Sequence, residues 1–145
     1  MKRILIINGP NLNLLGRRQP EIYGHTTMDE ILADLGREFP QIEIDYYQSN
    51  HEGCIIDRLQ EAGYGPEPSR PDAVILNAGG YTHTSVAIAD AVAAIPQPVV
   101  EVHLSDVANR EPFRRHSYLT AVCVATITAL GPAVYSQAIK TLIGV

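Results

Sequence analysis

The chain has 145 residues, 46% of them hydrophobic and 19% charged, with a formal net charge of -5. These values are typical of one soluble domain with a buried core, and the acidic balance argues against nucleic acid or an anionic membrane as a partner. The sequence has no apolar run long enough for a membrane span and no signal-peptide pattern, and Cys54 and Cys123 lie outside any metal-binding spacing, so we expect a cytoplasmic protein with reduced cysteines.

Strand-like and helix-like segments alternate along the chain. Short apolar or alternating runs predict strands over 3–8, 42–48, 73–77, 98–103 and 121–127. Helices are predicted from residue 27 to Pro40 and over 49–63, 85–95 and 131–143, and Gly and Pro content predicts a loop over 64–71. Capping-box patterns at Thr27–Glu30 and Ser49–Glu52 mark the first two helix starts.

Repeated strand–helix units predict a parallel sheet with right-handed crossovers and helices on both faces. Five strands in this length favour an α/β, flavodoxin-like doubly wound sheet of order 2-1-3-4-5, with residues 1–145 forming one catalytic domain. Such sheets bind ligands beyond the carboxyl ends of their strands, at the switch point of the strand order. The segments after Asn8, Asn77 and His103 are therefore expected to meet in one pocket.

Those three segments are rich in side chains that transfer protons or bind anions. Taken singly, a turn asparagine, a surface arginine pair or a histidine at a strand end is more often structural. Convergence at one sheet edge favours the functional interpretation. The set comprises Asn8, Asn11, Arg17, Arg18, Tyr23, Asn77, His83, His103, Ser105, Arg110, Arg114 and Arg115.

Several common site types do not fit this sequence. Gly9-Pro10-Asn11 after the first strand is not a GxGxxG fingerprint, no P-loop or GxSxG pattern occurs, and Pro10 lacks the N–H of a phosphate cradle. The five histidines show no HExxH spacing, and no cluster of carboxylates and histidines indicates a metal. Proton transfer on a polar, anionic small molecule remains.

A series of motifs covers the chain from about Ile4 to the last predicted helix. They are Gly9–Asn13, Leu15–Arg18, Pro20–Gly24, Gln48–Gly53, Asn77–Gly80, Thr82–Ser85, Glu101–Ser105 and Phe113–Tyr118. In order and spacing they resemble the type II 3-dehydroquinate dehydratases. The resemblance implies that 3-dehydroquinate is converted to 3-dehydroshikimate, in the shikimate pathway, by anti elimination through an enolate. It also implies that no metal, cofactor or Schiff base takes part.

The resemblance assigns the catalytic roles to five residues. Tyr23 is the base that removes the C2 proton, and Arg18 supplies the cation that a phenol, which ionises only near pH ~10, needs for this task. His103 is the acid that protonates the departing C1 hydroxyl, and Glu101, on the same strand face, orients it. Asn11 holds a water against the enolate oxygen.

The resemblance also implies a lid and a substrate-binding set. Arg17–Gly24 is the lid, with Gly16 and Gly24 as candidate hinges that close the site to water. The backbone N–H groups of residues 104 and 105 are expected to receive the substrate carboxylate. The substrate-binding residues are Asn77, His83, Asp90, Leu104, Ser105 and Arg114.

Asp90 lies in a predicted helix whose only other polar residue is Ser85. A helix that is apolar all round needs cover on both sides, and the sheet covers only one, so a subunit interface is expected on the other. The resemblance implies that Asp90 reaches the active site of a neighbouring subunit in a trimer, and that four trimers form a dodecamer. The simpler alternative is an exposed acid on a monomer.

The sequence departs from the family pattern at a few positions. Gln19 stands where the family commonly has Glu, Asp106 replaces a common Asn, and Ala108-Asn109 differs before Arg110. These differences affect the expected lid electrostatics and the geometry near Ser105.

Two other functions stay open at this point. A non-catalytic flavodoxin-like module that binds a small anion would need Arg114 and the amides of residues 104 and 105, but not Tyr23. An enzyme that eliminates or adds water on a related cyclic polyol acid would use similar residues. A Schiff-base mechanism is not expected, because Lys2 and Lys140, the only lysines, fall at the sheet edge opposite the predicted pocket.

Overall fold

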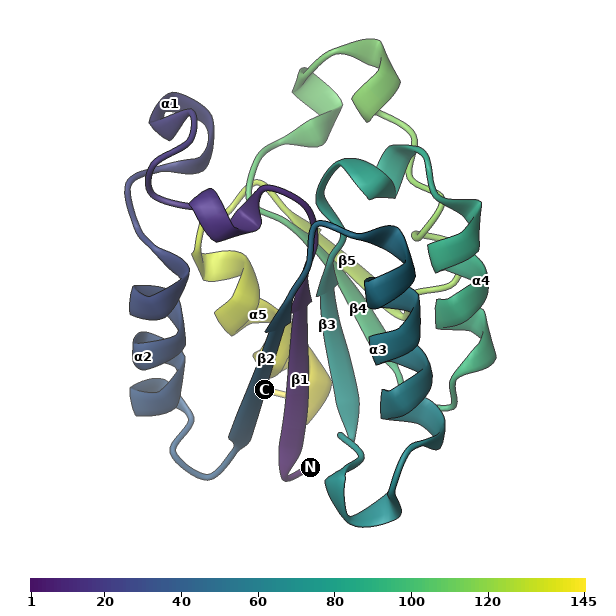
Figure 1. Cartoon of the computed structure of the whole chain (residues 1–145). Coiled ribbons are helices and arrows are strands. Elements are labelled where there is room, and N and C mark those ends of the chain that lie inside the picture. Colours follow the sequence, from purple (N-terminus) through teal and green to yellow (C-terminus); the bar gives the residue numbers. More distant parts are fainter.

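Five parallel strands form one sheet in the order β2-β1-β3-β4-β5 (Figure 1). The computed structural model describes all residues from 1 to 145. The predicted strand order and fold class are confirmed. The strands are β1 (Arg3–Asn8), β2 (Glu43–Gln48), β3 (Ala73–Asn77), β4 (Val99–His103) and β5 (Ala125–Thr128).

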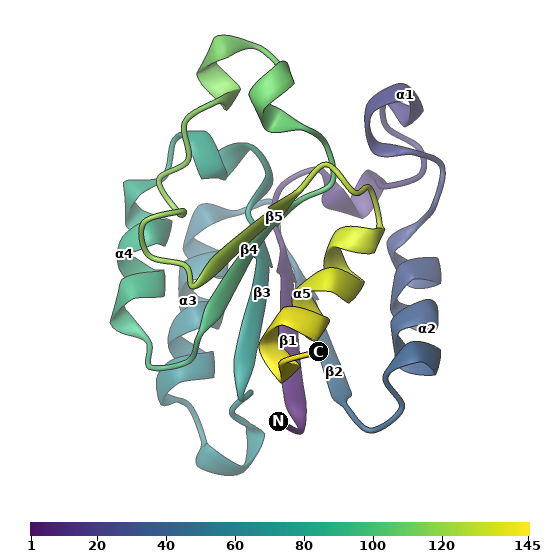
Figure 2. The same ribbon diagram turned by 180° about the vertical axis from the view of Figure 1, so that it is seen from behind.

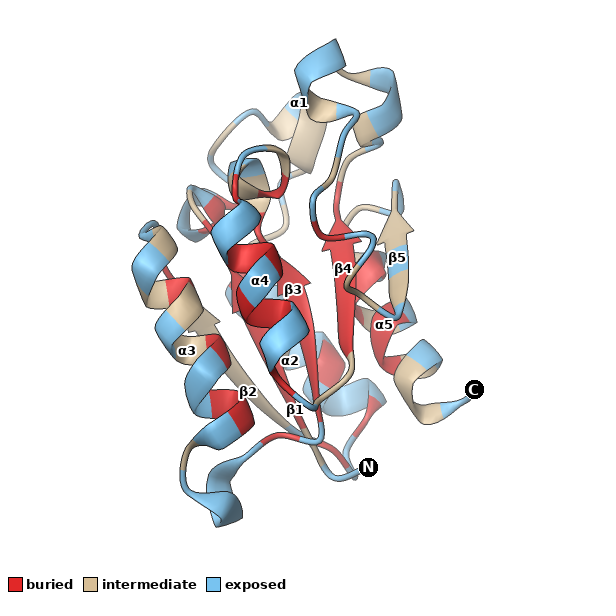
Figure 3. Cartoon of the chain, turned by 90° about the vertical axis from the view of Figure 1, so that its right-hand side faces the viewer, coloured by how far each residue is buried: buried red, intermediate tan, exposed pale blue.

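Helices cover both faces of this sheet. The helices are α1 (Pro20–Tyr23), α2 (Met28–Glu38), α3 (Glu52–Tyr64), α4 (Val86–Ala94) and α5 (Ala133–Ile143). Figures 1 and 2 show α3 and α4 on one face and α2 and α5 on the other. Because strand side chains alternate, Ile4 and Ile6 pack with α2 and α5, whereas Leu5 and Ile7 pack with α3 and α4. The central strands are consequently buried on both faces (Figure 3).

The first predicted helix start is confirmed and the second is wrong. The Thr27 hydroxyl accepts the N–H of Glu30 and caps α2. Helix α3 begins at Glu52 with His51 and not Ser49 at the N-cap, two residues later than the capping box predicts, and no side chain caps it. The reason lies in Ser49: its N–H still bonds to the carbonyl of Asn8 (3.1 Å), so the chain continues the sheet ladder, and its hydroxyl accepts the N–H of His51 (3.0 Å).

The last strand starts later than the apolar composition of 121–127 predicts. The N–H groups of Val122 and Cys123 both bond to the carbonyl of Leu119 at 3.0 Å, so this part of the segment is a turn. Strand β4 and helix α5 also begin one and two residues later than predicted, directly after Pro98 and Pro132, which is within the usual uncertainty of element ends. The short helix α1 was not predicted.

The carboxyl ends of the strands lie at one edge of the sheet, and loops cover this edge. Helix α1 and the segment 105–117 stand above this edge in Figure 1. The turns after β1 and β3 touch: the N–H of Gly9 bonds to the carbonyl of Asn77 (2.7 Å), and a Cβ at Gly9 would lie 2.5 Å from the carbonyl oxygen of Ala78. Only glycine allows this approach. None of the helices has the length and apolar character needed to cross a membrane.

Candidate active site

One pocket opens at the carboxyl edge of the sheet, where the switch point was expected. It brings together most of the side chains named from the sequence. Arg110 lines it as well, although the sequence argument gave it no role. The predicted residues that line the pocket are Asn11, Arg18, Tyr23, Asn77, His83, His103, Leu104, Ser105 and Arg114.

Other residues named from the sequence lie outside the pocket. Glu101 is buried directly behind His103. Asn8 is buried below the pocket floor, and Arg17 and Arg115 are exposed elsewhere. Asp90 is exposed on α4 and does not line the pocket of its own chain.

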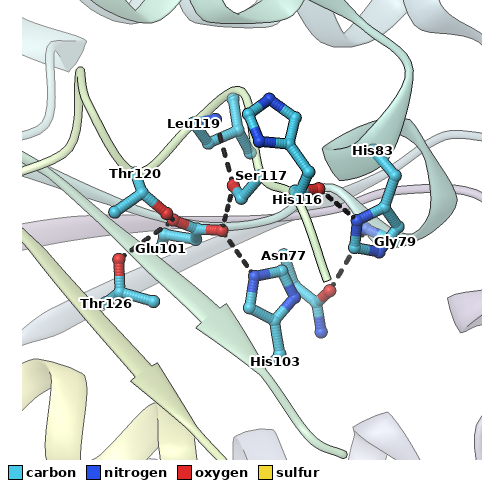
Figure 4. Close-up of polar contacts among 10 residues, drawn as sticks. All are labelled: Asn77, Gly79, His83, Glu101, His103, His116, Ser117, Leu119, Thr120 and Thr126. Atoms are coloured by element: carbon cyan, nitrogen blue, oxygen red, sulfur yellow. Dashed lines mark hydrogen bonds and ion pairs between the residues drawn. The ribbon is translucent and has the colours of Figure 1, made fainter. Parts of the chain in front are cut away.

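Glu101 carries the most fully bonded carboxylate of the site (Figure 4). The side chain has no solvent exposure, and its Oε2 lies 2.5 Å from Nε2 of His103. The hydroxyl of Ser117 donates to the same oxygen (2.6 Å), while those of Thr120 (2.8 Å) and Thr126 (3.0 Å) donate to Oε1. Two donors therefore meet each carboxylate oxygen.

These donors keep Glu101 ionised inside the protein. Burial acts to raise its pKa, but the hydrogen bonds from His103, Ser117 and Thr120 outweigh burial and hold the pKa at about 2. An ionised carboxylate only accepts hydrogen bonds, so Nε2 of His103 carries a hydrogen and Nδ1 is the nitrogen left for a ligand. Burial and the Glu101 charge raise the pKa of Cys123 to about 12, which leaves that thiol protonated and inert.

Tyr23, at the end of α1, lies against two guanidinium groups. Nη1 of Arg110 donates to the Tyr23 hydroxyl at 2.9 Å and reaches Ser105 Oγ at 3.4 Å. The guanidinium carbon of Arg18 lies 4.9 Å from the centre of the Tyr23 ring. The cation expected beside Tyr23 is present, but Arg110, and not Arg18, bonds its oxygen. The only sequence signal for this contact was the position of Arg110 on the polar segment after β4.

Two backbone amides and two side chains in the pocket are free to bind a polar ligand. The N–H groups of Leu104 and Ser105 donate to no other group of the protein. The side-chain amide of Asn11 likewise has no protein partner, and its backbone adopts a left-handed φ of 70°. The Arg114 guanidinium bonds Glu111 through Nε (2.9 Å), which leaves its terminal nitrogens available.

His83 has the opposite tautomer from His103. Its Nδ1 lies 2.7 Å from the carbonyl oxygen of His116, which only accepts, so Nδ1 carries the hydrogen and Nε2 is a free acceptor. Burial, together with the nearby charges of His103 and Arg114, lowers the pKa of His83 despite this hydrogen bond. The ring is therefore largely neutral near pH 7.

Both ends of the predicted lid need glycine. Gly16 has a φ of 93° and Gly24 a φ of 82°, in the left-handed region that side chains disfavour. A Cβ at Gly16 would also lie 2.9 Å from the carbonyl oxygen of His25. The backbone suits the hinge positions, and the closing motion itself stays a prediction.

The sequence pattern of the family described as "Dehydroquinase class II" matches residues 2–143. The chain belongs to this family. A "Catabolic 3-dehydroquinase" of Podospora anserina is 51% identical, with 96% of this chain and 92% of that protein covered. A "3-dehydroquinate dehydratase" of an Exiguobacterium species is also 51% identical, with 97% and 94% covered. The crystal structure of the type II dehydroquinase from Butyrivibrio crossotus has a TM-score of 0.92 at 41% identity, with 98% and 97% of the two chains covered.

Glu101 gives this dehydroquinase fold a pH-dependent stability. Its pKa is lower in the folded chain than the usual value of 4.5, so the ionised carboxylate stabilises the fold above about pH 4.5, and this contribution is lost as the pH falls toward about 2. Urea unfolding from pH 7 to 2 is expected to show the loss in the wild type and a smaller loss in Glu101→Gln. Glu67→Gln, which removes an exposed carboxylate, is the control. An unchanged pH slope in Glu101→Gln would contradict this assignment.

Proposed function

We propose that this chain is a 3-dehydroquinate dehydratase of the shikimate pathway, which removes water from 3-dehydroquinate to give 3-dehydroshikimate. One observation carries the proposal: a phenol beside two guanidinium groups and an imidazole backed by an ionised carboxylate line the same pocket. The first is suited to accepting a proton from carbon and the second to giving one to a leaving hydroxyl. Family membership and the names of the relatives agree with this reaction.

Tyr23 is proposed to take the proton from C2 of the substrate. As a phenolate it is stabilised by the hydrogen bond from Arg110 and by the charge of Arg18 over its ring. The electron pair of the broken C–H bond moves toward the C3 carbonyl and forms an enolate. Asn11, whose side-chain amide has no protein partner, is proposed to hold a water that donates to the enolate oxygen.

His103 is proposed to complete the elimination. With Nε2 held by Glu101, the protonated ring gives its Nδ1 hydrogen to the C1 hydroxyl. The enolate collapses, the C1–O bond breaks, water leaves, and the C1–C2 double bond forms in conjugation with the ketone. Glu101 stays ionised throughout, because its oxygens are already bonded by three hydroxyl groups besides His103.

The free donors of the pocket are proposed to bind the substrate carboxylate. The N–H groups of Leu104 and Ser105 and the guanidinium of Arg114 suit an anion, whereas neutral His83 suits a substrate hydroxyl. A simple anion-binding module would need only these groups. The Arg110–Tyr23 contact adds nothing to such a module, and it is the reason to prefer the enzyme.

The exposed face of α4 is proposed to be a subunit interface. Val86, Ala87, Ala93 and Ala94 are exposed there, and Asp90 is the only polar side chain among them. Apolar surface of this kind is stabilised by burial against another copy. We propose a cytoplasmic homo-oligomer, a dodecamer of four trimers, in which Asp90 reaches the substrate-binding pocket of a neighbouring subunit.

Tyr23→Phe is expected to lower turnover of 3-dehydroquinate by ~10²–10⁴-fold, because the general base is lost while the ring and its packing remain. Formation of the enone product is followed by ultraviolet absorbance. Tyr47→Phe, which removes a hydroxyl of a residue that does not line the pocket, is the control. Activity of Tyr23→Phe within a few-fold of the wild type would remove Tyr23 from the mechanism, and an inactive wild type would overturn the proposed function.

The purified protein is expected to have a mass larger than a dimer in light scattering at micromolar concentration. Asp90→Arg should reduce both the mass and the activity, because it introduces a cation where the interface buries an acid. Asp57→Arg, an exposed change on α3, should alter neither. A monomeric wild type would contradict the proposed assembly.

Replacing both lysines with arginine is expected to leave dehydration largely intact. Lys2 precedes β1 at the edge of the sheet opposite the pocket, and Lys140 lies late in α5, which runs back toward that edge (Figure 2). Neither amine reaches a substrate held beside His103. Borohydride added during turnover should therefore give no inactivation. A substrate-dependent adduct on either lysine, seen by mass spectrometry, would rule out the enolate mechanism.

A further inference from the structure

A hydrogen-bond network of buried polar side chains lies below the pocket floor, between the sheet and α5. Asn8 and Asn77 are the last residues of β1 and β3 and are paired in the sheet register. The hydroxyl of Tyr135, on α5, lies between them: it donates to Asn8 Oδ1 (2.7 Å) and accepts from Asn77 Nδ2 (3.2 Å). Asn8 and Tyr135 have no solvent exposure, and Asn77 is 3% exposed.

The hydrogen bonds of this network all donate in one direction, from Asn77 to Tyr135, from Tyr135 to Asn8 and from Asn8 to Tyr46. Asn8 directs Nδ2 toward Tyr46 Oη (3.4 Å) and Met28 Sδ (3.3 Å), so its Oδ1 faces Tyr135 and must accept. The single hydroxyl hydrogen of Tyr135 is thereby assigned to Asn8, and the Tyr135 oxygen can only accept from Asn77. Burial raises the pKa of Tyr135, so the hydroxyl keeps its hydrogen near neutral pH.

This direction fixes the orientation of the side-chain amide of Asn77, the one member of the network that lines the pocket. Its Nδ2 gives one hydrogen to Tyr135. Its Oδ1 accepts the N–H of Gly79 (3.3 Å), the contact that Figure 4 draws. The second Nδ2 hydrogen is left for a ligand. A flipped amide would lose both contacts and leave buried polar atoms unpaired, which is strongly disfavoured.

We propose that Tyr135 is a positioning residue, which makes Asn77 present an N–H donor to an oxygen of the bound substrate. The inference rests on the proposed function for the identity of that substrate. It also gives a role to Asn8, which the sequence placed at the functional edge but which has no access to the pocket.

Tyr135→Phe is expected to raise KM for 3-dehydroquinate ~10-fold and to leave kcat within ~3-fold, because it removes one oriented hydrogen bond and leaves Tyr23 and His103 in place. Tyr46→Phe is the matched control. It removes a phenol hydroxyl at the far end of the network and leaves both contacts of Asn77 intact. Its KM should stay within ~2-fold of the wild type.

A double-mutant cycle separates positioning from loss of stability. In an Asn77→Ala background, Tyr135→Phe should change KM less than ~2-fold, since no amide remains to be oriented. A ~10-fold effect in both backgrounds, or no effect on KM in either, would overturn the inference. If Tyr135→Phe does not fold, Asn8→Leu is used in the same cycle, because it removes the acceptor and frees the Tyr135 hydrogen to turn toward Asn77.

A second readout does not depend on turnover. Hydrogen exchange of the Asn77 side-chain amide, followed by NMR, should be slow in the wild type and in Tyr46→Phe and at least ~10-fold faster in Tyr135→Phe. An inactive wild type would overturn the proposed function and leave this exchange test of the inference in force. Equal exchange in all three proteins would overturn the inference.

Discussion

The ionised carboxylate of Glu101 lies inside the protein with no solvent exposure, where an unpaired charge would be strongly destabilising. Hydroxyl groups of Ser117, Thr120 and Thr126, with His103, replace the water that it lost. Thr126 is its register partner in β5, so the pairing of the last two strands itself supplies one donor. The strand order, the segment before β5 and the orientation of the His103 imidazole are thereby linked through one side chain.

The two histidines in the pocket differ because each has a different hydrogen-bond partner. His103 directs Nε2 toward the ionised carboxylate of Glu101, which leaves Nδ1 as the nitrogen that faces a ligand. His83 gives its Nδ1 hydrogen to a backbone carbonyl, and burial favours its neutral form. Their ring centres are 6.4 Å apart, so one pocket holds two imidazoles with opposite tautomers. In the proposed reaction, Tyr23 is the proton acceptor for the other half of the elimination.

The parts that the sequence predicted are those that depend on periodicity and topology. Buried strand runs gave the sheet order, and the order gave the pocket edge and most of its side chains. The contacts that orient the site were not predictable in the same way. Arg110 and Tyr23 are 87 residues apart, and Tyr135 and Asn77 are 58 apart, so no local pattern joins them. Ser49 shows the converse case, because a local capping pattern was overridden by a hydrogen bond across the sheet.

The tautomers of the two pocket histidines test the central claim, that Glu101 fixes the orientation and tautomer of the His103 imidazole, most directly. They can be measured by ¹⁵N NMR of protein labelled at histidine, with His103→Gln and His83→Gln used for assignment. Above the titration range of both rings, His103 is predicted to carry its hydrogen on Nε2 and His83 on Nδ1. In Glu101→Gln the preference of His103 should weaken. A His103 ring with its hydrogen on Nδ1 in the wild type would contradict the account.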